Sequence, residues 1–512
     1  MLLKERYWRI VNETNSNLLC DKQTGEVLPE VVDAIERPIA TLYRVRHNAE
    51  VSKGEIKRAL DYFCEAIEPT LSPVFFGRAG FNVQQGQRFV DAGQGECLVF
   101  FPNSSNYSKG FLLPLVRPLR SRPFPNPPNV GYVQVSSITQ LFQRSVLSRD
   151  TDLLLIAWMV LCWMPDRKQV MLELLGAPSS SLEQAHFLVR HLVDPASEPW
   201  QNDVPKHVKQ FDGMALRFYL LSFNQVDTLT DTQQQHLFSL MRGKQVQWQW
   251  NDKKLNVEIA VKCPVMLSSL ESVVTQSKLA DATISIEVEE EQHQEIGREE
   301  VPFLQSILAE SLVTIFGRVG ANWATVEHEN RFQHYGGLAD FCRVGELVAQ
   351  VLGRDPADFW AQFGSNQQSR REFEFEASPV AMAIQKLLEE EAGFIELSVK
   401  EWLSRLEAYR PETLEPDLWP TSSHKLGADF KAISPLLRDL GINLSSMGRR
   451  GPLRYWRAEK VSEPETLEDA SVFEGSGAGM EPERSETTRG DSGRSKTLEG
   501  LRGSRLRRLG RS

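Results

Sequence analysis

Short apolar runs alternate with stretches that have the apolar spacing of helices along residues 165–290. The runs have the length of strands, and turn-forming residues follow several of them. Strands that alternate with helices favour an α/β fold with a partly parallel sheet. The strand candidates are QVMLELLG, ALRFYLLSFN, LNVEIAVKCPVMLSS and ATISIEVEE.

Changes in this pattern predict six regions along the chain. The C-terminal tail is rich in Glu, Ser, Gly and Arg with few large apolar residues, so we expect it to be disordered. The predicted regions are 1–72 (N-terminal α+β region), 73–131 (β-rich segment and proline-rich linker), 132–296 (α/β core), 297–376 (helical), 377–460 (compact unit) and 461–512 (tail).

The compact unit at 377–460 has the pattern of a winged helix-turn-helix. Helical spacing in VAMAIQKLLEEE is followed by a short strand, two more helices and the hairpin candidate INLSSMGRRGPLRYWRAEK. Ser398 and Glu401 form a capping box for the second helix, and Ser422 or Ser423 caps the third. We therefore predict three helices and a β-hairpin wing.

In a winged helix the third helix enters the major groove of DNA and the wing contacts the phosphates. Basic residues occur at both places in this sequence, and arginine at a hairpin tip suits phosphate oxygens. DNA contact is the first interpretation, and a protein contact with a solvated arginine face is the alternative. The candidate DNA-binding residues are Lys425, Lys431, Arg449, Arg450, Arg454 and Arg457.

Composition limits the class of protein. The 512 residues are 41% hydrophobic and 25% charged, as expected of a globular protein with two to four domains. A net charge of −10 means that any nucleic-acid contact must be a local patch. Six scattered cysteines without a C-x-x-C pair argue against disulfides and a zinc site. The run LLLIAWMVLCWM is too short to cross a bilayer, so we expect a cytoplasmic, bacterial protein without membrane contact.

The stretch LELLGAPSSSLEQAHFLVRHLVDP, residues 172–195, has the strand, loop and helix order of a P-loop. A P-loop needs a lysine for the phosphates and a hydroxyl residue for Mg²⁺. This chain has Leu182 and Glu183 at those positions. The stretch is therefore either a degenerate nucleotide site or an ordinary loop between a strand and a helix.

The order of these segments from about Phe75 to Trp456 resembles helicase-type ATPases of prophages, plasmids and integrated elements. These are AAA+ or superfamily 3 proteins, also described as primase-helicases. The matching segments are LVDP at 192–195, PVMLSS at 264–269, LADA at 279–282, ASPVA at 377–381, WP at 419–420 and GRRG at 448–451. The resemblance implies an α/β, AAA+-like P-loop core with an N-terminal α+β region, a helical lid at 297–376 and a C-terminal winged helix-turn-helix.

The resemblance also implies that the nucleotide site has degenerated. Asn224 stands at the Walker B aspartate, Ser268 at the sensor asparagine and Ala282 at an arginine. Each missing group acts on the phosphates, the metal or the transition-state charge. A glutamate at about 4 Å from a phosphate charge would cost about 4 kcal/mol. The implied relic nucleotide site consists of Gly176, Ser179, Ser180, Ser181, Leu182, Glu183, Asn224 and Ser268, with no catalytic residue, metal or cofactor.

The first functional hypothesis is a non-catalytic, DNA-associated protein that acts in replication or maintenance of a prophage or mobile element. Its expected partners are DNA and an active ATPase or replication protein. The family forms rings, so the resemblance implies a homo-oligomer, although Ala282 weakens that implication. One alternative is an active ATP-dependent helicase or translocase that uses ATP and Mg²⁺ through Asp227 or Lys168. Another is a protein-interaction scaffold without DNA binding.

Overall fold

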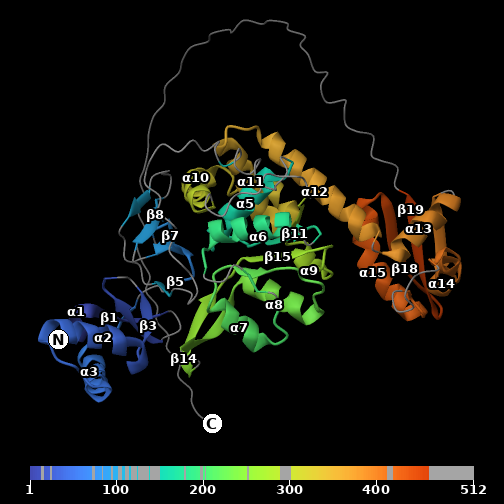
Figure 1. The fold of residues 1–512 in the computed structure, drawn as a ribbon. Helices are drawn as coiled ribbons and strands as arrows, with labels where there is room; N and C mark the ends of the chain where they lie inside the picture. Colours follow the sequence, from blue (N-terminus) through green and yellow to red (C-terminus); the bar gives the residue numbers. More distant parts are fainter. Residues whose placement is uncertain are drawn as a thin grey trace, which may run out of the picture. The chain divides into compact units, whose positions relative to one another are not determined.

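The computed structural model divides the chain into two compact units (Figure 1). The first consists of Met1–Ala383 and Arg410–Trp419, and the second begins at Ile384 and excludes Arg410–Trp419. The six predicted regions stay predictions, and the tail at 461–512 lies outside the described residues. The structure describes residues 1–460 except for 13–15, 24–25, 72–74, 83–84, 94–95, 102–106, 110–114, 117–123, 125–137, 139–149, 178–179, 197–199, 202, 251–252, 289–300, 377, 392 and 412–418.

The N-terminal region contains both helices and strands, as its sequence pattern predicted. Its four strands form one sheet in the order β3-β2-β1-β4, in which only β1 and β4 are parallel. The longer helices bury one apolar face against this sheet, with Ile35 and Leu60 in their shared core. The elements are α1 (Leu2–Arg6), β1 (Tyr7–Val11), β2 (Asn17–Asp21), β3 (Val27–Pro29), α2 (Val32–His47), α3 (Lys53–Ala66) and β4 (Thr70–Leu71).

An antiparallel sheet of short strands follows, in the order β6-β7-β8-β9. Arg78, just before its first strand, is buried and forms an ion pair with Asp194. Most of the predicted proline-rich linker lies outside the described residues. The strands of this sheet are β6 (Ala79–Asn82), β7 (Gln87–Gly93), β8 (Glu96–Phe100) and β9 (Tyr107–Lys109). Two further strands, β5 (Phe75–Phe76) and β10 (Leu115–Val116), pair with each other in parallel as a separate sheet.

The predicted parallel sheet is present, with the order β12-β15-β11-β16 and every neighbouring pair parallel. Alternate side chains of its strands enter two different cores, because helices cover both faces (Figure 1). Leu172 packs with α5 and α6, whereas Met171 packs with α7 and α8. The elements are α5 (Asp152–Cys162), β11 (Met171–Leu175), α6 (Ser180–Val193), α7 (Val208–Ala215), β12 (Leu221–Phe223), α8 (Asp231–Arg242), β13 (Lys244–Trp250), β14 (Lys253–Val261), β15 (Val265–Ser269), α9 (Ser277–Ala280) and β16 (Thr283–Glu287).

Two of the strand predictions differ from the structure. The run ALRFYLLSFN forms a strand only at Leu221–Phe223, because α7 ends at Ala215 and turns and bends occupy most of the residues between helix and strand. The run LNVEIAVKCPVMLSS forms two strands that belong to different sheets. Pro264 separates them, since proline lacks the N–H group that a continuous ladder requires.

Helices complete the first unit, as the apolar spacing predicted. The apolar run at 153–164 includes α5, in which every residue is buried. Among the described residues, no helix is long and apolar enough to cross a membrane. The helices are α10 (Val301–Asn322), η1 (Trp323–Thr325), η2 (Asn330–Leu338), α11 (Ala339–Val351) and α12 (Pro356–Glu376).

The second unit contains the predicted helices and hairpin around a three-stranded antiparallel sheet in the order β17-β19-β18. Both predicted caps are confirmed: Ser398 and Glu401 form a capping box, and Ser422 accepts a hydrogen bond from the Lys425 N–H group. The rings of Trp402 and Trp456 both pack edge-on against Phe430 in its core. The elements are α13 (Pro379–Glu390), which spans the boundary between the units, β17 (Phe394–Ser398), α14 (Val399–Leu406), η3 (Glu407–Tyr409), α15 (Ser423–Asp439), β18 (Ile442–Arg450) and β19 (Leu453–Lys460).

Candidate nucleic-acid interface

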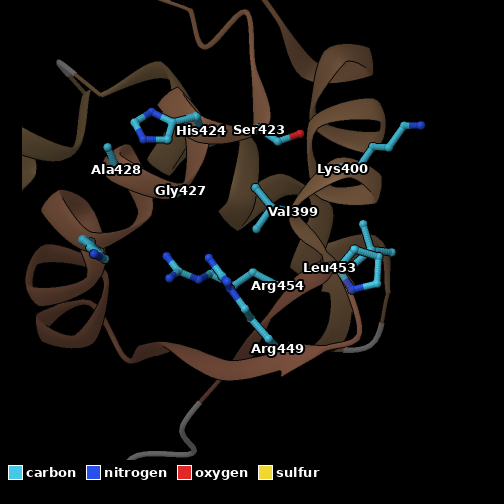
Figure 2. Close-up of a pocket in the computed structure, with 11 residues that line it drawn as sticks. Val399, Lys400, Ser423, His424, Gly427, Ala428, Arg449, Leu453 and Arg454 are labelled. Atoms are coloured by element: carbon cyan, nitrogen blue, oxygen red, sulfur yellow. The ribbon is translucent and has the colours of Figure 1, made fainter.

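A groove of about 650 Å³ opens in the second unit between α14, α15 and the β18–β19 hairpin (Figure 2). The start of α14 and the first half of α15 form one side, and the hairpin tip forms the other. Its lining combines basic side chains with small residues and has no acidic residue. The lining residues are Val399, Lys400, Ser423, His424, Gly427, Ala428, Lys431, Arg449, Pro452, Leu453 and Arg454.

Four cationic side chains line this groove: Lys400, Lys431, Arg449 and Arg454. All four are exposed, and none forms an ion pair within the part of the chain that the structure describes. Figure 2 shows the guanidinium groups of Arg449 and Arg454 extending into the hollow, while Lys400 points away from its centre. The groove therefore presents concentrated positive charge to an anion.

The hairpin holds its two groove arginines directly opposite one another. Arg449 and Arg454 are cross-strand partners in the β18–β19 register, and the turn between them contains Gly451 with a φ of +64°. Like charges at such a pair destabilise a sheet. The pair is therefore kept at a cost in stability, which an anion placed between the two side chains would offset.

Two of the other predicted DNA-binding residues are paired within the protein. Arg450 and Arg457 donate to Glu396 on β17, at 2.6 Å and 2.8 Å respectively. The hydrogen bonds from Arg457 and then Arg450 lower the pKa of the Glu396 carboxyl group below its ordinary value. These two arginines are therefore partly neutralised by a carboxylate on a third strand.

The six predicted residues are thus not equivalent in the structure. Lys431, Arg449 and Arg454 come together in the groove, whereas Lys425 lies on α15 outside its lining. Sequence reasoning missed Lys400 and His424. The capping box at Ser398 already placed Lys400 in the first turn of α14, but which helix ends converge was not visible in the sequence.

At the predicted nucleotide position, β11 ends at Leu175 and α6 begins at Ser180. Ser179 and the side chain of Ser180 lie outside the described residues, and Ser181 is half-buried. Leu182 is 1% exposed and belongs to the core that α5, α6 and the parallel sheet share. Glu183 is exposed and accepts a hydrogen bond of 3.4 Å from the Gln225 side chain. Residue 182, where the sequence comparison predicted the P-loop lysine, is therefore an apolar core position.

The polar residues at this edge of the sheet bond to one another. The Ser268 hydroxyl donates to Asn224 Oδ1 at 2.7 Å and accepts from the Gln225 N–H group at 3.0 Å. The Gly176 N–H group donates to the Ser269 carbonyl oxygen at 3.0 Å. A Cβ atom at Gly176 would lie 2.9 Å from the Val288 carbonyl oxygen, so close backbone packing explains this glycine.

The remaining candidates for nucleotide chemistry do not form a cluster. Ala282 is fully buried in the core on the other face of the sheet. Asp227 and Lys168 are exposed. Within the described ranges, no group of three or more histidine, cysteine, aspartate or glutamate residues is arranged to hold a metal ion.

Comparison with known proteins concerns mainly the second unit. Residues 380–471 match the family model described as the AICE RepA C-terminal domain. This match includes nearly all of α13, the groove and the hairpin, but it is a small part of the chain. A search among curated proteins gives no match. The C-terminal part of the chain is therefore similar to a domain of RepA proteins, and the wider resemblance over 75–456 stays a prediction.

Solved structures give weaker likenesses over more of the chain. The apo NrS-1 C-terminal region in its A form is 13% identical with a TM-score of 0.41, over 90% of this chain and 98% of that one. A full-length MCM homologue from Methanopyrus kandleri is 11% identical with a TM-score of 0.31, over 64% of this chain and 86% of that one. At these TM-scores neither likeness supports a conclusion about the fold.

Proposed function

We propose that this protein is a non-catalytic, DNA-associated protein that acts in replication or maintenance of a prophage or other integrated element. It contacts DNA through the basic groove of its second unit, and this groove is the main support for the proposal. The similarity of residues 380–471 to the AICE RepA C-terminal domain supports a role in replication.

The second unit is interpreted as a winged helix domain. Its order of helix, strand, helix, helix and two strands, with a three-stranded antiparallel sheet, is that of a winged helix. In this interpretation α15 is the helix that enters the major groove and β18–β19 is the wing. Lys431 extends from that helix, while Arg449 and Arg454 extend from the wing toward the phosphates.

The first unit is interpreted as an AAA+-like core that no longer binds nucleotide. A buried Leu182 cannot contact phosphates, and an uncharged Asn224 bonded to Ser268 offers no carboxylate for Mg²⁺. An exposed Glu183 adds a negative charge where the triphosphate would lie. Each of these observations supports loss of ATP hydrolysis.

The test of DNA contact compares two pairs of arginines from the same hairpin. Binding of the full-length protein to a labelled DNA duplex is measured by fluorescence anisotropy over a range of salt concentrations. Replacing Arg449 and Arg454 by alanine removes two phosphate contacts, so affinity should fall at least tenfold. The slope of log affinity against log salt should become less steep by about 1.8, at about 0.9 per phosphate.

Alanine at Arg450 and Arg457 is the matched control, because Glu396 already pairs with both residues. We expect this variant to lose less than about threefold in affinity. Equal losses in the two double variants would mean that the groove is not the interface. If the wild-type protein has no salt-dependent affinity for DNA, the DNA role is wrong and the scaffold alternative is favoured.

Loss of nucleotide binding is tested separately by calorimetric titration with Mg-ATP and with ADP up to millimolar concentration. We expect no binding heat, because the groups that hold phosphates and metal are missing. Micromolar binding would contradict the proposal. ATP turnover that collapses on replacing Asp227 by alanine would instead support the helicase alternative.

A further inference from the structure

The N-terminal sheet borders a second groove, of about 420 Å³, in the first unit. Within the described residues, β4 pairs with β1 only at Ile10 and Val11. The first half of β1 pairs with β2 on one edge and borders the groove on the other. Phe63 and Ile67 at the end of α3 form the opposite side. The groove therefore lies between one edge of β1 and an apolar side formed by α3.

Trp8 in this groove is 49% exposed, although its neighbours Tyr7 and Ile10 on the same strand are buried. An indole ring of this size contributes to stability only when it is buried. The Lys22 ammonium group lies over the ring, 5.7 Å from its centroid. Lys22 also donates to the Lys4 carbonyl oxygen at 2.5 Å, so the protein itself fixes this ammonium group beside the indole.

The charged groups around the ring differ in their partners. Arg9 donates to Glu30 and to the carbonyl oxygens of Cys64 and Ile67, so it holds the two sides of the groove together. Lys4 and Lys22 line the groove and form no ion pair with any residue that the structure describes. The lining also includes one acidic residue, Glu68, which is exposed. The cations outnumber it, and an exposed aromatic ring with two such cations matches a base and its neighbouring phosphates.

We propose that this groove binds single-stranded nucleic acid, with one base stacked on the part of the Trp8 ring that Lys22 does not cover and the adjacent phosphates near Lys4 and Lys22. Every base has a π-face, so a single tryptophan can hold any of them, and lysines beside it contact the backbone. The bases of a duplex already stack on one another, which restricts this site to a single strand. The lining of the groove in the second unit, in contrast, offers cations without a tryptophan, tyrosine or phenylalanine.

An added β-strand of a protein partner fits the same groove less well. Strand addition requires a row of free backbone groups along an edge. Here the described edge has only three residues, Tyr7 to Arg9, before β4 begins to pair. The carbonyl groups of Cys64 and Ile67 across the groove already accept from Arg9.

The test uses the full-length protein with Arg449→Ala and Arg454→Ala, which removes the basic groove of the second unit. Binding of labelled oligothymidylate of about 15 nucleotides is measured by fluorescence anisotropy, with oligouridylate of equal length as a second probe. In this background Trp8→Ala should weaken binding about tenfold, and Trp8→Phe by less than about threefold, because a phenyl ring also stacks. Lys4→Gln with Lys22→Gln should make the salt slope less steep by about 1.4.

Tyr62→Ala is the matched control, because Tyr62 is 73% exposed on α3 and does not line the groove. This variant should bind like its parent. Equal effects of Trp8→Ala and Tyr62→Ala, or a parent that binds neither oligothymidylate nor oligouridylate, would overturn the proposal. Affinity for oligouridylate alone would restrict the ligand to RNA.

Two further measurements keep the result interpretable. Thermal unfolding of each variant checks that it is folded. If the Trp8→Ala variant does not fold, the change in salt slope of the Lys4→Gln, Lys22→Gln variant decides the outcome. Duplex binding through the second unit is measured separately with unmodified Arg449 and Arg454. Failure of the duplex experiment therefore leaves the Trp8 proposal testable, and failure at Trp8 leaves the proposed function unaffected.

Discussion

The edge of the parallel sheet and the groove of the second unit both contain residues that the sequence suggested as ligand-binding. At the sheet edge, Leu182 is in the core and Asn224 bonds to Ser268. In the groove, Arg449 and Arg454 are exposed opposite one another without an acidic partner in the described part of the chain. In the first region Asn224 and Ser268 bond to each other, whereas in the second the two guanidinium groups stay available.

This difference decides which region is suited to a ligand. A buried polar group that is bonded within the protein gains little from a ligand, because the ligand must first displace that partner. Two unpaired arginines on facing strands repel each other, so an anion lowers the free energy directly. Whether polar side chains are already bonded within the protein is therefore stronger evidence about ligand binding than the order of motifs along the chain.

The largest expected loss of stability comes from replacing Asp194, a buried carboxylate of the first unit that pairs with two arginines. Asp194 accepts from Arg78 at 2.7 Å, from Arg190 at 2.9 Å and from two backbone N–H groups. Burial raises the pKa of Asp194, but the two guanidinium groups outweigh it and lower that pKa to about 2. Asp194→Ala leaves two buried cations unpaired, so the free energy of unfolding in urea should fall by about 3–5 kcal/mol.

Glu396→Ala is the control for that prediction, since Glu396 also pairs with two arginines but at the surface. Its urea midpoint should move much less. If both variants unfold at the same urea concentration, burial does not explain the difference between the two regions.

The next prediction concerns restoring the P-loop residues with Leu182→Lys and Glu183→Thr. Leu182 is in the core, so an ammonium group there should lower the free energy of unfolding by about 2–4 kcal/mol. We expect no gain of Mg-ATP binding in calorimetry. Residue 183 is exposed, so the single substitution Glu183→Thr should leave the free energy of unfolding nearly unchanged. A double variant that is as stable as the wild type and binds Mg-ATP would contradict the assignment of residue 182 to the core.

A smaller change in stability should come from lowering the pH, through the buried His186. His186 on α6 is buried with Nε2 2.6 Å from the Ser222 hydroxyl, and burial followed by the charge of Arg190 lowers its pKa to about 3. Below pH 6.5 the unfolded chain binds a proton that the folded protein does not. The contribution of neutral His186 is therefore complete above pH 6.5 and falls as pH decreases toward 3.

Between pH 6.5 and 5 this linkage amounts to about 1.4 kcal/mol for each pH unit. Urea unfolding of the wild type and of His186→Gln at several pH values checks it. The variant should lose less stability than the wild type over this interval. Parallel pH curves for the two proteins would show that His186 is not kept neutral.

The smallest expected change in stability is at Gly427, which lines the groove on α15. A Cβ atom there would meet no atom within 4 Å, so packing does not require glycine. Gly427→Ala should therefore stabilise the second unit by about 0.5–1 kcal/mol, measured by thermal unfolding. It should at the same time weaken duplex binding, because the methyl group fills the groove.

Gly364→Ala on α12 is the matched control, since that glycine is exposed and also has free space. It should gain stability without any change in DNA affinity. If Gly427→Ala binds DNA as tightly as the wild type, the ligand does not approach the helix at this point.

Much of the secondary structure could be predicted because its causes are local. Alternation of strands and helices predicted the parallel sheet, and the Ser398–Glu401 spacing predicted a helix start that the structure confirms. The split of residues 255–269 at Pro264 was missed because both halves have the apolar character of a strand. Their different sheets follow from pairing with β13 and with β11, which the run itself does not specify.

The candidate site was less predictable than the fold. Lys431, Arg449 and Arg454 were predicted in one set of candidates and lie together in the groove, but Arg450 and Arg457 looked equivalent to them in the sequence. Their difference depends on Glu396, more than fifty residues away along the chain. Trp8 gave no sequence signal, because an exposed tryptophan and a core tryptophan look the same in a strand.

The sequence by itself determined many of the helices and strands, the caps, and that leucine and asparagine stand at positions 182 and 224. These features depend on residue type and on spacing within a few positions. Only the tertiary structure decided which cations lack a partner, that Leu182 is in the core, and that Trp8 is exposed. The physical reason is that burial and ion pairing act between atoms that are close in space, whatever their separation along the chain.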